Sequence, residues 1–106
     1  MEIDSKASDD KALQKARILS ETARIPWREL QRFFASGAVV AVEPGLDLVE
    51  VACAMADDDK ARVERWMAAA QVAPARDDQA GEWYAGDRLM WAVVLSPFVL
   101  VQPVDG

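Results

Sequence analysis

The stretch LMWAVVLSPFVLVQPV, residues 89–104, decides the fold because it is almost entirely apolar within a sequence of mixed polarity. Its apolar part ends near Val101, so it is shorter than the roughly 20 residues that a membrane-spanning helix needs, and Pro97 would break such a helix. In an extended chain, apolar residues fall on both sides of residues 89–95, which is typical of a strand covered on both faces. The stretch therefore predicts two buried strands, residues 88–95 and 98–102.

Ser96-Pro97 leaves two arrangements of these strands open. Proline cannot donate a hydrogen bond to a neighbouring strand, so it is confined to sheet edges, turns and bulges. The dipeptide is then either a tight turn between two paired strands or a bulge within one long strand. A single long strand would leave a free sheet edge, and such an edge is where a partner would dock.

The composition indicates one globular domain. The chain has 106 residues, of which 52% are hydrophobic and 28% charged, which is enough for one packed core. Its net charge of −6 disfavours nucleic acid, since lysine and arginine supply most of the affinity for phosphates. Residues 1–11 lack the basic start and apolar core of a signal peptide, and the single cysteine, Cys53, cannot form an internal disulfide. We expect a cytoplasmic protein without a membrane segment.

The helical parts follow from periodicity and capping residues. Residues 1–8 are expected to be a disordered tail, and residues 9–106 a single domain. A helix over residues 11–24 follows Asp9 or Asp10, with a modest apolar stripe of Leu13, Ala16, Leu19 or Ser20, and Ala23. A second helix is expected over residues 26–36, a third after Asp57-Asp58-Asp59, and a short fourth between Asp77 or Asp78 and Gly86.

The rest of the chain predicts a small sheet. AVVAVE (38–43) and LDLVEVACAM (46–55) flank the turn signal Pro44-Gly45, and Val49, Val51, Cys53 and Met55 alternate, so we expect a β-hairpin. QVAPA (71–75) is either a brief strand or an extended connection. The predicted fold class is α+β: a single compact domain with about four helices packed on a small, mostly antiparallel sheet.

Few residues suggest chemistry. The chain has no histidine, which removes the commonest general base and metal ligand, and no cofactor is expected. Arg28 and Arg32, with Arg24 nearby, form a basic ridge that either binds an anion or is simply solvated. Asp57, Asp58 and Asp59 either bind a metal ion or cap a helix, and capping fits helix-end preferences better. Cys53 is expected to be a buried structural thiol. The four tryptophans are expected in the core: Trp27, Trp66, Trp83 and Trp91.

Three segments together carry a family resemblance: ETARIPWRELQRFFASG (21–37), LDLVEVACAMADDDKARVERWM (46–67) and LMWAVVLSPFVLVQ (89–102). They are similar to the small bacterial family known as domain of unknown function 2288, and the similarity covers about Ser20 to Gln102. The resemblance implies a cytoplasmic, single-domain protein, and it carries no assigned activity, cofactor or catalytic residue.

Three functional hypotheses follow, and the first is favoured. It is a non-enzymatic module for protein interaction or self-association, indicated by the missing catalytic apparatus and the many apolar strand positions. The alternative is a regulatory domain that binds a small ligand or anion on the face of Arg28 and Arg32, and less favoured still is an enzyme. The third is a winged-helix-like nucleic-acid binder, indicated by the late order of helices and strands and opposed by the negative charge.

Overall fold

The hairpin at the centre of the sheet comes from the apolar stretch near the end of the chain. The computed structural model describes residues 2–105, and the side chains of residues 10–105. Strand β4 (Leu89–Leu95) pairs antiparallel with β5 (Phe98–Pro103), from Met90 opposite Pro103 to Leu95 opposite Phe98. Ser96-Pro97 is thus the tight turn of a hairpin, and the bulge alternative is wrong.

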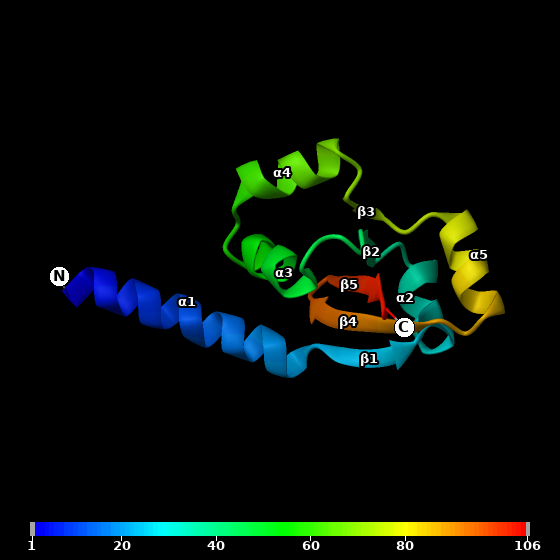
Figure 1. The fold of residues 1–106 in the computed structure, drawn as a ribbon, viewed down its shortest axis with the longest axis horizontal. Coiled ribbons are helices and arrows are strands. Elements are labelled where there is room, and N and C mark those ends of the chain that lie inside the picture. Colours follow the sequence, from blue (N-terminus) through cyan, green and yellow to red (C-terminus); the bar gives the residue numbers. More distant parts are fainter. Residues whose placement is uncertain (1, 106) are drawn as a thin grey trace.

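The other strands add to the two sides of this hairpin, in the order β1-β4-β5-β2-β3 (Figure 1). Strand β1 (Ala23–Pro26) pairs antiparallel with β4, and β2 (Val39–Val42) runs parallel to β5. Strand β3 (Val72–Pro74) closes the far edge, antiparallel to β2, so QVAPA contains a strand. The sheet is mostly antiparallel, as predicted, and its edges are β1 and β3.

Within residues 2–105, five α-helices pack around the sheet, rather than about four. They are α1 (Glu2–Glu21), α2 (Gln31–Ala35), α3 (Leu48–Ala56), α4 (Lys60–Ala68) and α5 (Asp77–Ala85), and a 3-10 turn, η1 (Trp27–Leu30), precedes α2. The predicted α+β class is confirmed. Among the described residues, no helix combines the length and the apolar character that crossing a membrane requires.

The middle of the central hairpin is buried on both faces, as its sequence predicts, whereas Leu89, Trp91, Val94 and Phe98 of the same two strands are 36–57% exposed. Val93 and Leu100 are cross-strand partners on the face covered by α1 and α3, and each side chain is at most 1% exposed. Their neighbours Ala92 and Val101 belong to the second core cluster, on the face covered by η1 and α5. This second cluster contains Trp27, which is fully buried and lies edge-on to the rings of Phe34 and Trp83. The sheet thus separates two core clusters, one packed against each of its faces.

The expected hairpin of residues 38–55 is wrong in its second half, because residues 48–56 form α3. Asp47 caps this helix, since its side chain accepts hydrogen bonds from the backbone N–H groups of Val49 and Glu50. In the run LVEVACAMA, the apolar residues fit both the alternating pattern of a strand and one face of a helix. Leu48, Val51 and Ala52 are buried at helical spacing, and an apolar run of this length does not distinguish strand from helix by periodicity.

The first predicted helix is also too long at its carboxyl end. It ends at Glu21, and Ala23–Pro26 form the edge strand β1 instead. Pro26 then leads into η1 and α2, which together replace the predicted helix over residues 26–36. The expected disordered tail, residues 1–8, falls where the structure describes no side chains, so it stays a prediction.

Four helices end in the same way, on a residue with positive φ. In α4, Ala69 is the C-cap, Ala70 has a φ of 59°, and the N–H groups of Ala70 and Gln71 donate to the carbonyls of Met67 and Trp66. This is the Schellman pattern, in which a left-handed residue lets the chain close the last turn. The corresponding residues after α2, α3 and α5 are Gly37, Asp58 and Asp87. Glycine is the residue type that this conformation favours, and among these four positions it is found only at Gly37.

Candidate functional site

Helix α1 carries an apolar stripe that the body of the protein leaves exposed. Among the residues of α1 whose side chains the structure describes, the buried one is Ile18, at 2% exposed, and it was not part of the predicted stripe. Leu13 and Leu19 are 68% and 53% exposed, and three small residues between and beside them are also exposed: Ala12, Ala16 and Ser20. These five residues are called the α1 stripe below. The predicted apolar face therefore exists, but this protein's own core does not cover it.

The α1 stripe continues into an apolar groove at the base of the helix. The groove has a volume of about 250 Å³ and is lined by Leu19, Thr22, Leu48, Val49 and Trp91. Trp91 is 36% exposed, so it is not the core residue that its spacing predicts, and the Arg24 guanidinium lies 5.6 Å from its ring centroid. Leu19 belongs to both the stripe and the groove. The uncovered apolar surface thus runs from α1 onto strand β4 of the sheet.

The three predicted anion-binding arginines lie on three different elements, and each packs against a different ring. Arg24 is on β1, beside Trp91. Arg28 is on η1: its Nε donates to the Tyr84 carbonyl at 3.1 Å, and its guanidinium lies 4.9 Å from the Tyr84 ring centroid. Arg32 is on α2, 5.0 Å from the Phe33 ring centroid. Their anion-binding role stays a prediction from the sequence.

The three aspartates separate α3 from α4. Asp57 is the C-cap of α3, and Asp58 has a φ of 57°. Asp59 is the N-cap of α4, since its side chain accepts from the Arg62 N–H at 3.3 Å. In the part of the chain whose side chains are described, no group of three or more His, Cys, Asp or Glu residues is placed to hold a metal ion. The observed contacts of these residues are those of helix ends.

Cys53 lies on α3 and not on a strand, and it is half-buried. Burial raises the pKa of its thiol, and the negative charge of Asp57 raises that pKa further. A reactive cysteine requires the opposite shift, because the thiolate is the nucleophile. The environment of Cys53 therefore favours the unreactive thiol.

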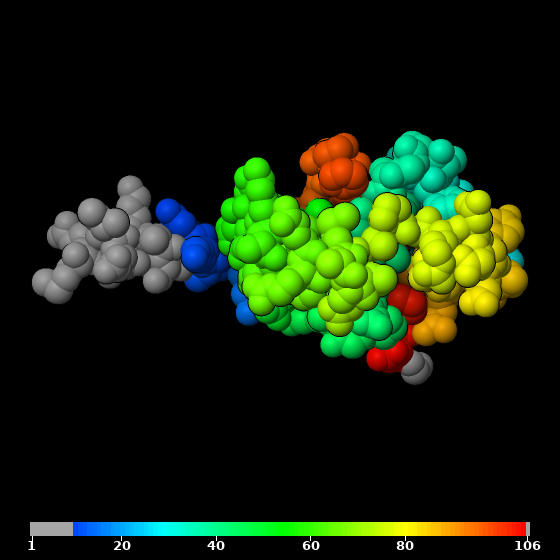
Figure 2. All heavy atoms as spheres, turned by 90° about the horizontal axis from the view of Figure 1, so that it is seen from above, coloured from blue at the N-terminus to red at the C-terminus, as the bar shows by residue number. Residues whose placement is uncertain are grey.

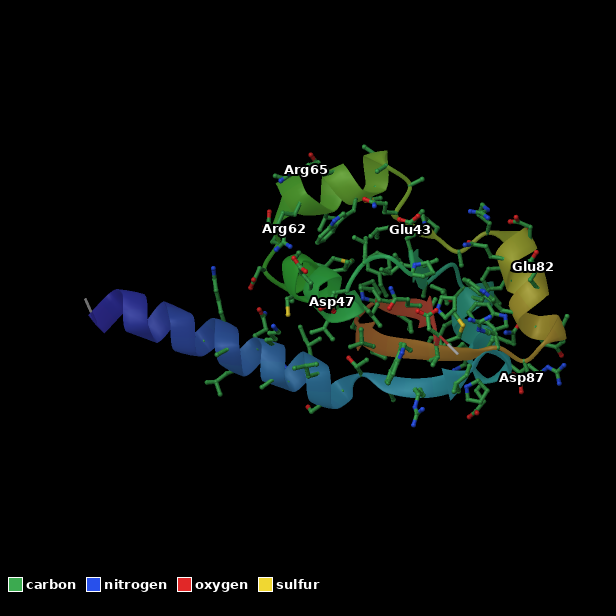
Figure 3. All side chains as sticks on the ribbon, viewed as in Figure 1. Glu43, Asp47, Arg62, Arg65, Glu82 and Asp87 are labelled. Atoms are coloured by element: carbon green, nitrogen blue, oxygen red, sulfur yellow. The ribbon has the colours of Figure 1, made fainter. Side chains whose placement is uncertain are left out.

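A larger cleft lies between α3 and α4, with a volume of about 490 Å³. Arg62 and Arg65 line it from α4, Glu50 from α3, and Asp47 from the N-cap of α3. Figure 3 labels Arg62 and Arg65 on α4 and Asp47 beside α3. Arg62 forms an ion pair with Glu50, and its guanidinium lies 5.0 Å from the Trp66 ring centroid. The sequence holds the signal for this cleft, because Arg62, Arg65 and Trp66 are spaced to share one helical face. This signal was missed because Trp66 was interpreted as a core residue.

The comparisons with known proteins identify the family. The chain belongs to the family described as protein of unknown function (DUF2288), whose model matches residues 13–103. The fold is similar to the NMR solution structure of PA1075 from Pseudomonas aeruginosa, with 43% sequence identity, a TM-score of 0.77, and coverage of 86% of this chain and 84% of that chain. No protein with a curated description matches. The resemblance read from the sequence is confirmed, and it brings no activity with it.

Proposed function

We propose that this protein is a non-enzymatic self-association module, in which α1 packs antiparallel against α1 of a second copy. One observation carries the proposal: the α1 stripe is uncovered although it is apolar. An apolar stripe on a helix normally marks the face that packs against another element. An isolated helix is also marginal in water, so most helical stability comes from such packing. The projecting part of α1 gains this packing from a partner.

The spacing of the α1 stripe fits a second copy of the same helix. Ala16 is at its centre, with leucines three residues away on each side and small residues, Ala12 and Ser20, four residues away on each side. At 100° per residue, Leu13 and Leu19 point about 60° to either side of Ala16. The residue types of the stripe are therefore arranged symmetrically about Ala16. A two-fold antiparallel pair places Leu13 of each copy beside Leu19 of the other, which is the self-complementarity that an isologous interface requires.

The groove at the base of α1 extends this interface. In an antiparallel pair centred on Ala16, the projecting half of one α1 lies along the base of the other. The groove of Leu48, Val49 and Trp91 is in the path of that helix, because it adjoins Leu19. Ala16 at the crossing allows the two helices to approach closely, since its side chain is a single methyl group.

The association state tests the proposal directly. We expect sedimentation equilibrium of the purified protein to show a reversible monomer–dimer equilibrium. Ala16→Glu places a charge on the two-fold axis and should weaken the dimer by at least about tenfold. Ala61→Glu is the matched control, because Ala61 is an exposed alanine on α4 and the added charge is the same. A monomeric wild type at high concentration, or an Ala16→Glu variant that associates like the control, contradicts the proposal.

Cross-linking tests the geometry. A residue on a two-fold axis faces its own copy, and Ala16→Cys brings two thiols within reach of a disulfide, whose Cα atoms are usually about 4.4–6.8 Å apart. In a background where Cys53 is replaced by serine, oxidation should give a covalent dimer with Ala16→Cys and none with Ala61→Cys. Equal yields from both variants would rule out the antiparallel pairing.

A further inference from the structure

The cleft lies between α3 and α4, and α4 contributes few side chains to the core. None of the residues of α4 is fully buried; Arg62, Val63 and Trp66 are half-buried, and Trp66 alone among them packs against the main core cluster. In the view from above, α4 lies on the outside of the molecule and covers α3 (Figure 2). The space beneath it, about 490 Å³, is within the usual range for small-molecule pockets.

The walls of the cleft are nevertheless well fixed. The Gln102 side chain donates hydrogen bonds to the carbonyls of Glu43 and Leu46, at 2.8 and 2.7 Å, and so anchors the loop that supplies the Leu46 wall. On the other side, the Gln71 N–H closes the end of α4 by donating to the Trp66 carbonyl at 2.9 Å. The site is therefore formed before any ligand arrives.

The polar groups of the cleft leave one guanidinium without a side-chain partner. Asp47 is used as the N-cap of α3, and Glu50 pairs with Arg62. Arg65 also lines the cleft, and no described side chain forms an ion pair or hydrogen bond with its guanidinium. Arginine binds carboxylates well because its planar fork matches their two oxygens.

The apolar groups of the cleft define the rest of a ligand. Leu46, Val51 and Trp66 line it beside Arg65, and these side chains suit a flat or branched hydrocarbon group. Among the described side chains that line the cleft, Arg65 supplies the one unpaired guanidinium, because Arg62 is paired with Glu50. The cleft can therefore neutralise one negative charge of a ligand and not two. One guanidinium and an apolar wall match a single negative charge attached to a ring-sized apolar body.

We propose that this cleft binds a small organic monocarboxylate, with Arg65 holding the carboxylate and Trp66, Val51 and Leu46 contacting the apolar part. The Gln71 side chain lines the same space and supplies an amide for a further hydrogen bond. The Arg62–Glu50 pair holds the side of the site against Trp66. This site is separate from the α1 stripe, so it neither requires nor excludes the self-association proposed above.

Titration of the protein with benzoate, followed by two-dimensional NMR, tests the proposal. Benzoate should shift the indole N–H signal of Trp66, identified by its loss in Trp66→Phe, and the backbone amide signals of residues 62–71. Benzamide has the same size without the charge, and inorganic phosphate has charge without the apolar body, so both should bind at least about tenfold more weakly. Absence of benzoate shifts at the cleft, or equal binding of benzamide, overturns the proposal.

Two variants locate the carboxylate. Arg65→Gln keeps a polar side chain and removes the charge, and it should weaken benzoate binding by about tenfold. Arg32→Gln is the control, because Arg32 is an exposed arginine on α2 and does not line the cleft. Each variant is first required to give the dispersed spectrum of the folded protein. Equal weakening by both variants, or none by Arg65→Gln, shows that Arg65 does not hold the carboxylate.

Discussion

Ile18 and Leu13 lie on nearly opposite sides of α1, and their environments differ accordingly: Ile18 is 2% exposed and Leu13 is 68% exposed. Ile18 joins the core cluster with Leu48 and Val93, so it attaches α1 to the body. Leu13 contributes to the α1 stripe. Ile18 therefore contributes to the folding of α1 onto the body, whereas Leu13 contributes to the association that we propose.

Ile18→Ala should lower the free energy of unfolding of the monomer by about 2–5 kcal/mol, because it leaves a cavity in the core. Leu13→Ala should change the same quantity by less than about 0.5 kcal/mol, since its side chain is exposed. Urea unfolding at low micromolar protein concentration measures both. At high concentration, Leu13→Ala should in addition weaken the dimer, and a large loss of monomer stability with Leu13→Ala would contradict the placement of its side chain.

Ala70→Gly should stabilise the protein by about 1 kcal/mol. Ala70 has a φ of 59°, a left-handed conformation that costs an alanine roughly 1–2 kcal/mol and a glycine much less. Part of the gain is lost because glycine also has more freedom in the unfolded chain. Ala68→Gly, within α4, is the control and should destabilise by roughly 0.5–1 kcal/mol. The opposite signs of the two changes in thermal unfolding check the prediction.

Asp59→Ala should destabilise the protein by about 1 kcal/mol, because it removes the N-cap of α4. Asp59→Asn should retain most of the stability, since an amide oxygen also accepts the Arg62 N–H. Urea unfolding of the two variants distinguishes capping from a role that needs the charge. If the asparagine variant lost as much as the alanine variant, the carboxylate charge and not the cap would be the important property.

The pH dependence of Cys53 alkylation should follow its raised pKa. Because burial and Asp57 both favour the neutral thiol, the rate with iodoacetamide should reach half its maximum at a higher pH than that of an ordinary thiol, whose pKa is about 8.5. Asp57→Asn should shift the midpoint downward. Lys15→Gln should shift it upward, because the positive charge of Lys15 lowers this pKa. A midpoint at or below that of a free thiol would contradict the burial.

The sequence was most informative where apolar residues occupy both faces of an element. Residues 89–102 correctly predicted two buried strands, because apolar residues on both sides of an extended run are typical of a strand covered on both faces. The sequence left open whether Ser96-Pro97 is a turn or a bulge, and the pairing of β4 with β5 shows that it is a turn. The sequence was least informative for residues 48–56, where Leu48, Val51 and Ala52 fit a helix and Val49, Val51 and Cys53 fit a strand. The Asp47 cap decides between them, and an aspartate after Pro44-Gly45 also suits a turn.

The candidate sites depended on which side of a helix meets the body, and periodicity alone does not determine that. The stripe of Leu13, Ala16 and Leu19 was recognised as apolar, but the sequence could not show that Ile18 faces the core instead. The cleft was missed because it forms between two helices, one of which was expected to be a strand. Arg24, Arg28 and Arg32 were predicted as one ridge, and their three aromatic partners come from distant parts of the chain.

The order of strands in the sheet has a consequence for synthesis of the protein. β1 pairs only with β4, and β2 before that point has only the three-residue β3 as a partner, which is too little for a stable sheet by itself. Both cores also lie against the β4–β5 hairpin. The nascent chain therefore has no sheet on which to fold until residues 89–103 have left the ribosome. Until this hairpin forms, the apolar surfaces of α3 and of residues 27–42 stay exposed, which makes them natural targets for chaperones during translation.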